Sequence, residues 1–290
     1  MVIKTENTIR LALPKGRMEK GVYKLFADAG INIQTTARAY RPSINLEEYE
    51  AKLLKPRDVV EMLKFGSRDI GFAGADWVAE QEADLVELLD TELDPVKLVA
   101  AAPSSFLVDG KLPKKPLLIA SEYENLTKKW IKENSLVATF VRSYGATEVF
   151  PPEDADCIVD NTATGSTLSN NNLVIISELM KSSTRLYANP EVMDNVVKRE
   201  IVENLMLVLK SVLEARKRVS LEVNVSKEYF ETLVKILPCM KEPTISALYG
   251  ETGFALKVAV PREMLPRLIP LIKANGGTDI VVTELSQIVP

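Results

Sequence analysis

The chain has 290 residues, of which 46% are hydrophobic and 26% are charged, a balance that is ordinary for globular proteins and excludes an intrinsically disordered chain. Its 40 acidic and 36 basic residues give a net charge of −4, which argues against a protein that binds nucleic acid through a broadly basic surface. There is no histidine, which excludes Ser-His-Asp and Cys-His catalytic groups, histidine-ligated metals and imidazole acid-base chemistry.

The first part of the chain alternates strand-like and helix-like segments. Residues 9–13 form a short apolar run that predicts a strand, and a Pro-Lys-Gly-Arg turn at 14–17 separates it from a helical pattern that ends at Gly30. A helix over 58–65, a strand over 70–73 and a Gly-Ala-Asp turn that opens another helix follow. Because strands and helices alternate, we expect a largely parallel sheet.

A second lobe follows a change of pattern at residues 95–116, where an apolar run gives way to a loop with several prolines. We interpret this segment as a crossover between two lobes. The elements predicted beyond it are strands over 117–120, 138–141 and 157–159 and a helix over 125–133. Two similar α/β lobes imply a cleft between them.

The last part of the chain begins with one long helix, predicted over 194–217 from its apolar spacing. Residues 219–225 then alternate apolar and polar side chains, as is typical of a strand with one buried face. A helix, two strands, a second helix and a last strand are predicted over 230–237, 244–248, 254–260, 262–274 and 279–283. This βαββαβ order predicts a ferredoxin-like module.

A candidate phosphate site lies where the strand around Cys157 ends. Asp160 is followed by a loop of small hydroxyl residues around Gly165. A phosphate needs several converging donors, which backbone amides and the hydroxyls of Ser and Thr can supply, and an ionised carboxylate suits the vicinal hydroxyls of a sugar. A solvated Ser/Thr loop without a ligand is the alternative, and composition alone does not separate the two.

Cations gather in the first lobe. Lys15 and Arg17 flank Gly16 just before a predicted helix N-terminus, where the free amides and the helix dipole favour an anion. The alternative is a surface turn with solvated charges, and Arg38, Arg41 and Arg57 are each, taken singly, more typical of a surface than of a site. Neither a P-loop nor a G-x-G-x-x-G motif occurs, so the sequence gives no support to a standard NTPase or dinucleotide site.

The two cysteines indicate a reducing compartment. Cys157 and Cys239 both lie in apolar-leaning segments, and without histidine Cys157 is predicted to be a core residue. The residues after Met1 contain no apolar stretch of signal-peptide length, and no segment approaches the ~18 to 20 apolar residues of a membrane span. We therefore expect a cytoplasmic protein.

Several segments, in this order along the chain, resemble ATP phosphoribosyltransferase, the first enzyme of histidine biosynthesis. They are LALPKGR at 11–17, DIGFAGAD at 69–76, ASEY at 120–123 and DCIVDNTATGSTL at 156–168. PTISAL at 243–248 and GGTDIVV at 276–282 resemble the family's C-terminal regulatory domain. The resemblance is therefore to the long form of the enzyme, and it extends over nearly the whole chain.

The resemblance implies an α/β fold with two catalytic lobes like those of a type II periplasmic binding protein, followed by the ferredoxin-like regulatory domain. Lobe I would comprise residues 1–96 and 188–210, lobe II residues 97–187, and the regulatory domain residues 211–290. It also implies Mg²⁺ as a cofactor and ATP and phosphoribosyl pyrophosphate as substrates. The enzyme would be inhibited by histidine and would form a homohexamer built from dimers, with no nucleic-acid or membrane partner. Residues 88–94 and 286–288 depart from the family's pattern.

The same resemblance implies the site residues by position. The catalytic residues would be Asp160, Lys15 and Arg17. The substrate-binding residues would be Arg38, Asn161, Thr162, Ala163, Thr164, Gly165, Ser166, Thr167, Leu168, Gly74, Asp76, Ser121, Glu122 and Tyr123. The loop from Asp160 to Leu168 would hold the ribose and 5-phosphate, and Lys15, Arg17 and Arg38 would face the polyphosphates. The histidine site would be lined by Asn224, Met240, Thr244 and Ala259, and no metal ligand is assigned.

Two functions are consistent with these residues. The first is an enzyme in which N1 of ATP displaces pyrophosphate from phosphoribosyl pyrophosphate, a reaction that needs positioning and charge neutralisation more than a general base. The second is a non-catalytic binding or regulatory protein with the same two lobes. The intact Asp160 to Leu168 loop, together with Lys15 and Arg17, favours the enzyme, because a purely regulatory chain would have no reason to keep them.

Overall fold

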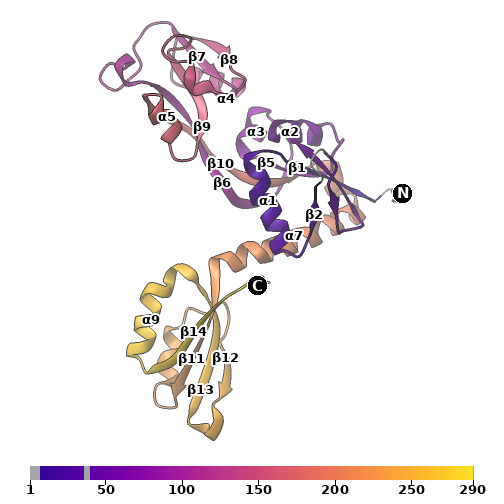
Figure 1. Ribbon diagram of the computed structural model, residues 1–290, viewed down its shortest axis with the longest axis vertical. Helices are drawn as coiled ribbons and strands as arrows, with labels where there is room; N and C mark the ends of the chain where they lie inside the picture. The colour runs from indigo at the N-terminus through magenta and orange to yellow at the C-terminus, as the bar shows by residue number, and fades with distance from the viewer. Residues whose placement is uncertain (1–6, 36–39, 290) are drawn as a thin grey trace. The chain divides into compact units, whose positions relative to one another are not determined.

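The structure is a computed structural model that describes residues 7–35 and 40–289 (Figure 1). Contacts within the chain divide it into two compact units, Met1–Lys24 with Ile31–Glu203, and Leu25–Gly30 with Asn204–Pro290. The helices α1 (Arg17–Asp28) and α7 (Val196–Lys217) both run from the first unit into the second. The domain boundary predicted at residue 211 lies later in α7 than this division.

The first unit is built on one eight-stranded sheet with the order β4-β1-β5-β10-β6-β9-β7-β8. Its strands are β1 (Ile9–Pro14), β4 (Tyr49–Leu54), β5 (Ile70–Gly74), β6 (Val86–Pro103), β7 (Leu117–Ser121), β8 (Ala138–Arg142), β9 (Cys157–Thr162) and β10 (Leu173–Ala188). Its other helices are α2 (Pro56–Lys64), α3 (Ala75–Glu80), α4 (Glu124–Glu133), α5 (Ser166–Asn170) and α6 (Pro190–Asp194), with short turns at Ser104–Phe106 and Thr147–Val149. A separate pair joins β2 (Ile33–Gln34) to β3 (Ser43–Ile44).

The sheet is mixed, so the prediction of a largely parallel sheet is wrong at its centre. Lobe I holds the parallel strands β4, β1 and β5, and lobe II holds the parallel strands β8, β7 and β9. The long strands β6 and β10 pair antiparallel between these two groups and run from one lobe to the other (Figure 1). Their pairing contains several irregularities, and β6 mixes charged with apolar residues, so no single period marked these strands in the sequence.

The apolar run in β6 shows how lobe II acquires its core. Leu98, Ala100 and Ala102 pack in a cluster with Tyr123 and Trp130 on one side of the sheet. The alternate residues of the same strand, Val99 and Ala101, pack with Ile158 and Leu168 on the other side. A strand whose two faces are both covered needs a continuous apolar run rather than an alternating one.

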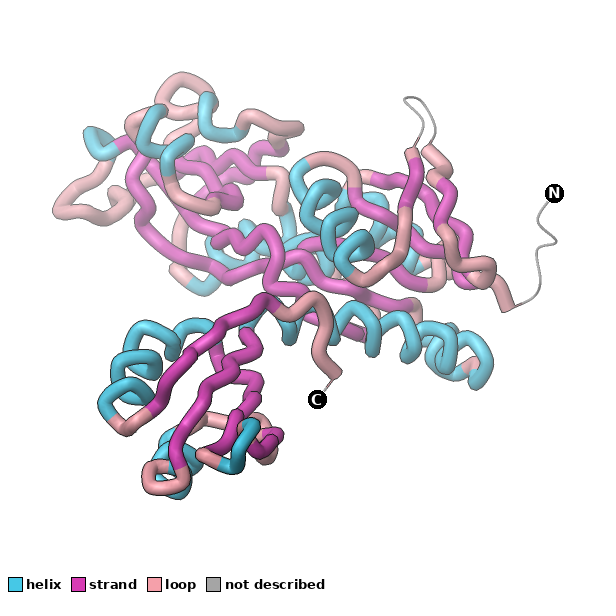
Figure 2. Tube along the Cα trace, turned by 60° about the horizontal axis from the view of Figure 1, so that its bottom comes forward, coloured by secondary structure: helices cyan, strands magenta, loops and turns pink. Residues whose placement is uncertain are grey.

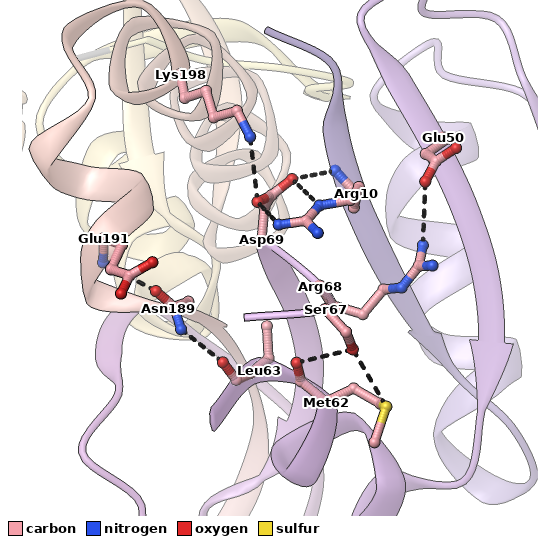
Figure 3. Close-up of polar contacts among 10 residues, drawn as sticks. All are labelled: Arg10, Glu50, Met62, Leu63, Ser67, Arg68, Asp69, Asn189, Glu191 and Lys198. Atoms are coloured by element: carbon pink, nitrogen blue, oxygen red, sulfur yellow. Dashed lines mark hydrogen bonds and ion pairs between the residues drawn. The ribbon is translucent and has the colours of Figure 1, made fainter. Parts of the chain in front are cut away.

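Asp69 connects the start of β5 to β1 and to the first turn of α7 (Figure 3). Arg10 donates from Nε and Nη2 to its carboxylate at 3.0 and 2.7 Å, and Lys198 Nζ lies 3.3 Å from Oδ1. Burial by itself would raise the pKa of Asp69, but the hydrogen bonds from Arg10 and the charge of Lys198 hold it below its usual value. The cluster therefore fixes α7 to lobe I through an ionised carboxylate that is only 1% exposed.

The second unit confirms the predicted ferredoxin-like βαββαβ order. Its elements are β11 (Arg218–Ser226), α8 (Phe230–Ile236), β12 (Thr244–Ala247), β13 (Gly253–Pro261), α9 (Leu265–Ala274) and β14 (Gly277–Glu284). The antiparallel strands have the order β12-β13-β11-β14, and the two helices appear beside this sheet in Figure 2. Leu233 of α8 and Leu268 and Ile272 of α9 form the core with Leu221 and Val223.

The two-lobed α/β region followed by the ferredoxin-like domain confirms the predicted fold class. Among the helices of residues 7–35 and 40–289, none combines the length and apolar character that crossing a membrane would require.

Candidate functional site

The predicted catalytic and substrate residues lie in four turns that follow strands of the parallel groups. These turns connect β1 to α1, β5 to α3, β7 to α4 and β9 to α5. The carboxyl ends of parallel strands are where α/β proteins place their ligands, because the helices that follow present their N-termini there. The topology therefore puts all four turns at strand ends suited to a ligand.

The turn from β9 to α5 carries the candidate phosphoribosyl loop. The strand extends further than predicted and includes Asp160, Asn161 and Thr162. Gly165 has a φ of +81° and precedes the first residue of α5, and its amide donates to Thr162 Oγ1 at 2.9 Å. A side chain would strain the backbone at this φ, so glycine is required for the turn.

Hydroxyl groups are presented around this turn. Thr164 Oγ1 and Ser166 Oγ share a hydrogen bond of 2.9 Å, and both residues are exposed, as are Ala163 and Thr167. Leu168 is 3% exposed and packs into the core of lobe II, which anchors α5. The loop thus combines a buried anchor with exposed hydroxyls at the first turn of a helix, and hydroxyls and first-turn amides are groups that can donate to a phosphate.

Asp160 stands before this loop in an environment that disfavours its charge. Burial raises the pKa of Asp160 to about 7, and the hydrogen bond of 2.7 Å from the Asn161 amide to Oδ1 acts in the opposite direction. The negative charges of Glu148 and Glu122 raise the pKa, and the positive charge of Arg17 lowers it. Arg17 of lobe I therefore acts electrostatically on the loop of lobe II.

Lys15 and Arg17 lie on either side of Gly16 in the turn from β1 to α1. Gly16 has a φ of +84°, and Arg17 is exposed at the first position of α1. Lys15 Nζ lies 4.3 Å from the centre of the Tyr40 ring. Within residues 7–35 and 40–289, neither cation forms an ion pair, which suits an anion site. Arg38 lies outside the residues that the structure describes.

Three of the predicted substrate residues contact one another in the structure. Tyr123 donates its hydroxyl to Asp76 Oδ2 at 2.6 Å, and Asn161 Nδ2 donates to the Tyr123 hydroxyl at 2.9 Å. Ser182 Oγ of β10 donates to Asp76 Oδ1 at 2.7 Å. Tyr123 is fully buried and Asp76 is 3% exposed. Burial and the charge of Asp76 raise the pKa of Tyr123 well above its usual value, so the hydroxyl remains a donor.

This network joins the two lobes. Asp76 lies at the start of α3 in lobe I, whereas Tyr123, just before α4, and Asn161, in β9, belong to lobe II. Trp77 supports it by stacking on the Tyr123 ring, with the ring centres 4.7 Å apart. Gly74 leaves room for it, since a Cβ there would lie 2.1 Å from Asp76 Oδ1. In this arrangement Asp76 and Tyr123 set the positions of the lobes.

Ser121 and Glu122 shape the turn from β7 to α4. Ser121 is fully buried, and its hydroxyl donates to the Val159 carbonyl and accepts from the Tyr123 amide at 2.5 and 2.9 Å. Glu122 is half-buried, and its backbone carbonyl accepts from Arg142 Nη1 at 2.9 Å. Ser121 thus connects β7 to β9, and the carboxylate of Glu122 adds negative charge near Asp160.

The sequence interpretation missed Glu80, which forms a second connection between the lobes. Glu80 ends α3, is 6% exposed, and accepts from the backbone amides of Asn125 and Leu126 at 3.1 and 3.0 Å. A carboxylate that accepts hydrogen bonds from the first-turn amides of a helix satisfies donors that have no partner within the helix, and its charge complements the helix dipole. Local pattern could not reveal this contact, because 45 residues separate its partners along the chain.

Arg57 is exposed, as the sequence interpretation expected. It lines a polar recess of about 200 Å³ between α2, α3 and α4, together with Trp77, Glu122 and Arg142. Its guanidinium carbon lies 6.0 Å from the centre of the Trp77 ring. The recess borders the turn at Glu122, so Arg57 is a third cation available near the candidate site.

The predicted histidine-site residues mostly share one face of the second unit's sheet. Asn224 pairs with Ala255, Ala259 with Ser220, and Thr244 with Lys257. This register places Asn224, Ala259 and Thr244 on the face opposite the helices α8 and α9, whereas Met240 lies half-buried in the loop before β12. Asn224 Nδ2 donates to Asp279 Oδ2 at 3.1 Å.

Known proteins are similar to this chain over nearly its whole length. A family model described as ATP phosphoribosyltransferase matches residues 55–211, and a second, the HisG C-terminal domain, matches residues 215–287. An ATP phosphoribosyltransferase of Pelotomaculum thermopropionicum is 37% identical over 287 residues, with 97% of this chain and 99% of the relative covered. That of Chlorobium phaeobacteroides is 35% identical over 289 residues, with 98% of each chain covered.

A solved structure is similar to a large share of the chain. It is the ATP phosphoribosyl transferase (HisG:HisZ) complex from Thermotoga maritima, with a TM-score of 0.64 and 28% sequence identity. The match covers 71% of this chain and 99% of that one.

Proposed function

The chain belongs to the ATP phosphoribosyltransferase family, whose members are enzymes of histidine biosynthesis, and from this premise we propose its reaction and regulation. N1 of ATP forms a bond to C1 of the ribose of phosphoribosyl pyrophosphate. The bond from C1 to the pyrophosphate oxygen breaks, and pyrophosphate leaves with the electron pair. The products are phosphoribosyl-ATP and pyrophosphate.

The turn from β9 to α5 supports this proposal most directly. Asp160 lies two residues before the end of β9, at the point where a sugar would lie, and the hydroxyls and first-turn amides that follow suit a 5-phosphate. The carboxylate would accept from the ribose hydroxyls once it is ionised. Burial already disfavours its negative charge, so a bound ligand with hydroxyl donors or positive charge would stabilise the ionised form.

Lys15 and Arg17 would neutralise the charge that develops on the departing pyrophosphate. Both lie at the N-terminus of α1, where the helix dipole adds to their positive charge. Because a polyphosphate leaving group is already stable and N1 carries its own lone pair, the reaction needs no histidine base. Arg38 stays a prediction of the family resemblance.

The family resemblance also implies Mg²⁺. Among residues 7–35 and 40–289 the structure holds no cluster of three carboxylate or thiol groups able to bind a metal ion. Magnesium that is held mainly by substrate phosphates and water, with at most one or two carboxylates, needs no such cluster. Such an ion would supply charge neutralisation to the pyrophosphate, and the protein would contribute the orientation of the ribose and the cations of lobe I.

An assay of ATP-dependent pyrophosphate release from phosphoribosyl pyrophosphate tests the reaction. Asp160→Asn and Thr167→Ala should each lower kcat/KM for phosphoribosyl pyrophosphate by roughly 10- to 150-fold, as expected for losing a hydrogen bond to a charged group. Ser169→Ala, an exposed position in the same helix, is the matched control and should keep full activity. Wild-type protein that releases no pyrophosphate would instead indicate the non-catalytic regulatory alternative.

We also propose that the second unit binds free histidine and lowers activity. The sheet face opposite α8 and α9 presents Asn224 and Thr244 as hydrogen-bonding groups, and Ala259 lies on the same face. Met240 lies four residues before Thr244 in the sequence. A coupling of about 1 to 3 kcal/mol between the two sites would reduce substrate affinity by roughly 5- to 150-fold. The hexamer built from dimers and the cytoplasmic location stay predictions of the same kind.

Calorimetry with free histidine tests this regulatory proposal. Thr244→Ala should weaken histidine binding and histidine inhibition together while leaving activity without histidine unchanged. Thr252→Ala, which is exposed in the same unit, provides the control. An active wild-type enzyme that binds no histidine would restrict the role of this unit to assembly.

A further inference from the structure

A large cavity in lobe II lies away from the loops assigned to the substrates. It has a volume of about 800 Å³ and is lined by residues 110–116, by the end of α4 and the segment after it, and by residues 176 and 177 of β10. We name it the Trp130 groove after one of the residues that line it. Neither Lys15, Arg17 nor any residue of the Asp160 to Leu168 loop lines it.

The groove has an apolar floor. Trp130 is 6% exposed, and its indole N–H donates to Ser177 Oγ at 3.3 Å, so the polar atom of its side chain already has a partner. Leu112, Leu136 and Ile176 are half-buried and pack against the same core cluster. A volume of this size above an apolar floor is typical of small-molecule sites, which span roughly 300 to 1,000 Å³.

The rim of the groove is basic. Lys111, Lys114 and Lys115 all line it, and none of the lining residues carries a carboxylate. The ammonium of Lys115 lies 3.7 Å from Asp156 Oδ1 and 4.5 Å from the centre of the Phe106 ring, so its charge already has partners. Lys111 and Lys114 are exposed and form no ion pair with any residue in the ranges 7–35 and 40–289. In a protein of net charge −4, these lysines make the rim locally positive.

We propose that the Trp130 groove binds a small organic anion with an aromatic or branched apolar body. The apolar part would lie against Trp130, Leu136 and Ile176, and the carboxylate, sulfonate or phosphate group would contact Lys111 and Lys114. Charge complementarity selects an anion, and the floor selects one that buries apolar surface. The site is independent of the proposed reaction, because its lining excludes the substrate loops.

The aromatic sulfonate 8-anilinonaphthalene-1-sulfonate is a suitable probe, because it accepts energy from excited tryptophan. The chain has two tryptophans, Trp77 and Trp130, so Trp77→Phe leaves Trp130 as the single donor. We expect saturable energy transfer from Trp130, weakened by added salt. Lys111→Glu combined with Lys114→Glu should weaken binding by about fivefold or more, because two attractive contacts become repulsive.

Lys129→Glu is the matched control, since Lys129 is exposed on α4 but does not line the groove. It should bind the probe as the parent does, and an excess of ATP should not displace the probe. Equal binding by the double lysine variant, or displacement by ATP, would overturn the proposal. If Trp77→Phe does not fold, the indole N–H resonances of the wild-type protein give the same answer, because only that of Trp130 should shift with the probe.

Discussion

The hydroxyl of Tyr123 donates to the carboxylate of Asp76 at 2.6 Å, and the two residues come from different lobes. The family resemblance assigned both to substrate binding. In the structure their polar atoms satisfy one another and are buried. They therefore hold lobe II against lobe I and place Asn161, the neighbour of Asp160, by its hydrogen bond to the same hydroxyl.

Tyr123→Phe should lower the free energy of unfolding by about 1 to 3 kcal/mol, because Asp76 and Asn161 each lose a buried partner. Tyr144→Phe is the control, since Tyr144 is 85% exposed and should show no change. Urea denaturation followed by circular dichroism measures both variants. Equal stability of Tyr123→Phe and wild type would show that the buried network contributes nothing to holding the lobes.

Glu80→Ala should lower the free energy of unfolding by about 1 to 2 kcal/mol, the usual cost of losing a helix cap. Glu80→Gln keeps one acceptor oxygen and should lose less. Hydrogen exchange gives a local readout, because the amides of Asn125 and Leu126 should exchange faster in Glu80→Ala. Glu133→Gln, exposed at the other end of α4, should leave those two amides protected as in wild type.

The activity of the enzyme should fall below pH 7 as Asp160 takes up a proton, because the pKa of its carboxyl is raised to about 7 and the proposed role needs the ionised form. Glu148→Gln removes a negative charge that raises this pKa, so the acid limb of kcat/KM against pH should move to lower pH. Glu153→Gln, an exposed control, should not move it. An acid limb that stays in place in Glu148→Gln would contradict the assignment.

The same shift predicts the pH dependence of stability. Between the usual pKa of 3.8 and about 7, the folded protein holds a proton on Asp160 that the unfolded chain has released. The free energy of unfolding contributed by this group therefore falls as pH rises through that range. Asp160→Asn should remove this contribution, which chemical denaturation at several pH values between 4 and 8 can measure.

Asp69→Asn should lower the free energy of unfolding at pH 7 by roughly 1.5 to 3 kcal/mol, because Arg10 and Lys198 lose a shared buried carboxylate. The pKa of the Asp69 carboxyl is lower in the folded protein than in the unfolded chain. The carboxylate therefore stabilises the fold fully when the pH is above the pKa of the unfolded chain, and this stabilisation disappears as the pH falls through the pKa of the folded protein. The difference between wild type and variant should therefore shrink in acid. Asp109→Asn, in an exposed turn, should cost nothing at either pH.

Local pattern in the sequence determined most elements of this protein. The apolar run at β1, the alternation in β11 and the helical spacing of α7 each reflect burial of one or both faces of an element, and burial needs no knowledge of the distant partner. The positive φ of Gly165 follows from local turn chemistry in the same way. Composition alone excluded histidine chemistry.

Tertiary structure alone decided how the lobes are joined. The strands β6 and β10 pair over most of their length although their partner residues lie far apart in the chain, and no periodicity reveals that pairing. The contacts of Glu80 with α4, of Tyr123 with Asp76 and of Lys198 with Asp69 likewise connect distant parts of the sequence. Such polar pairs gain their energy only when folding brings both partners out of water together, so their positions depend on the completed sheet.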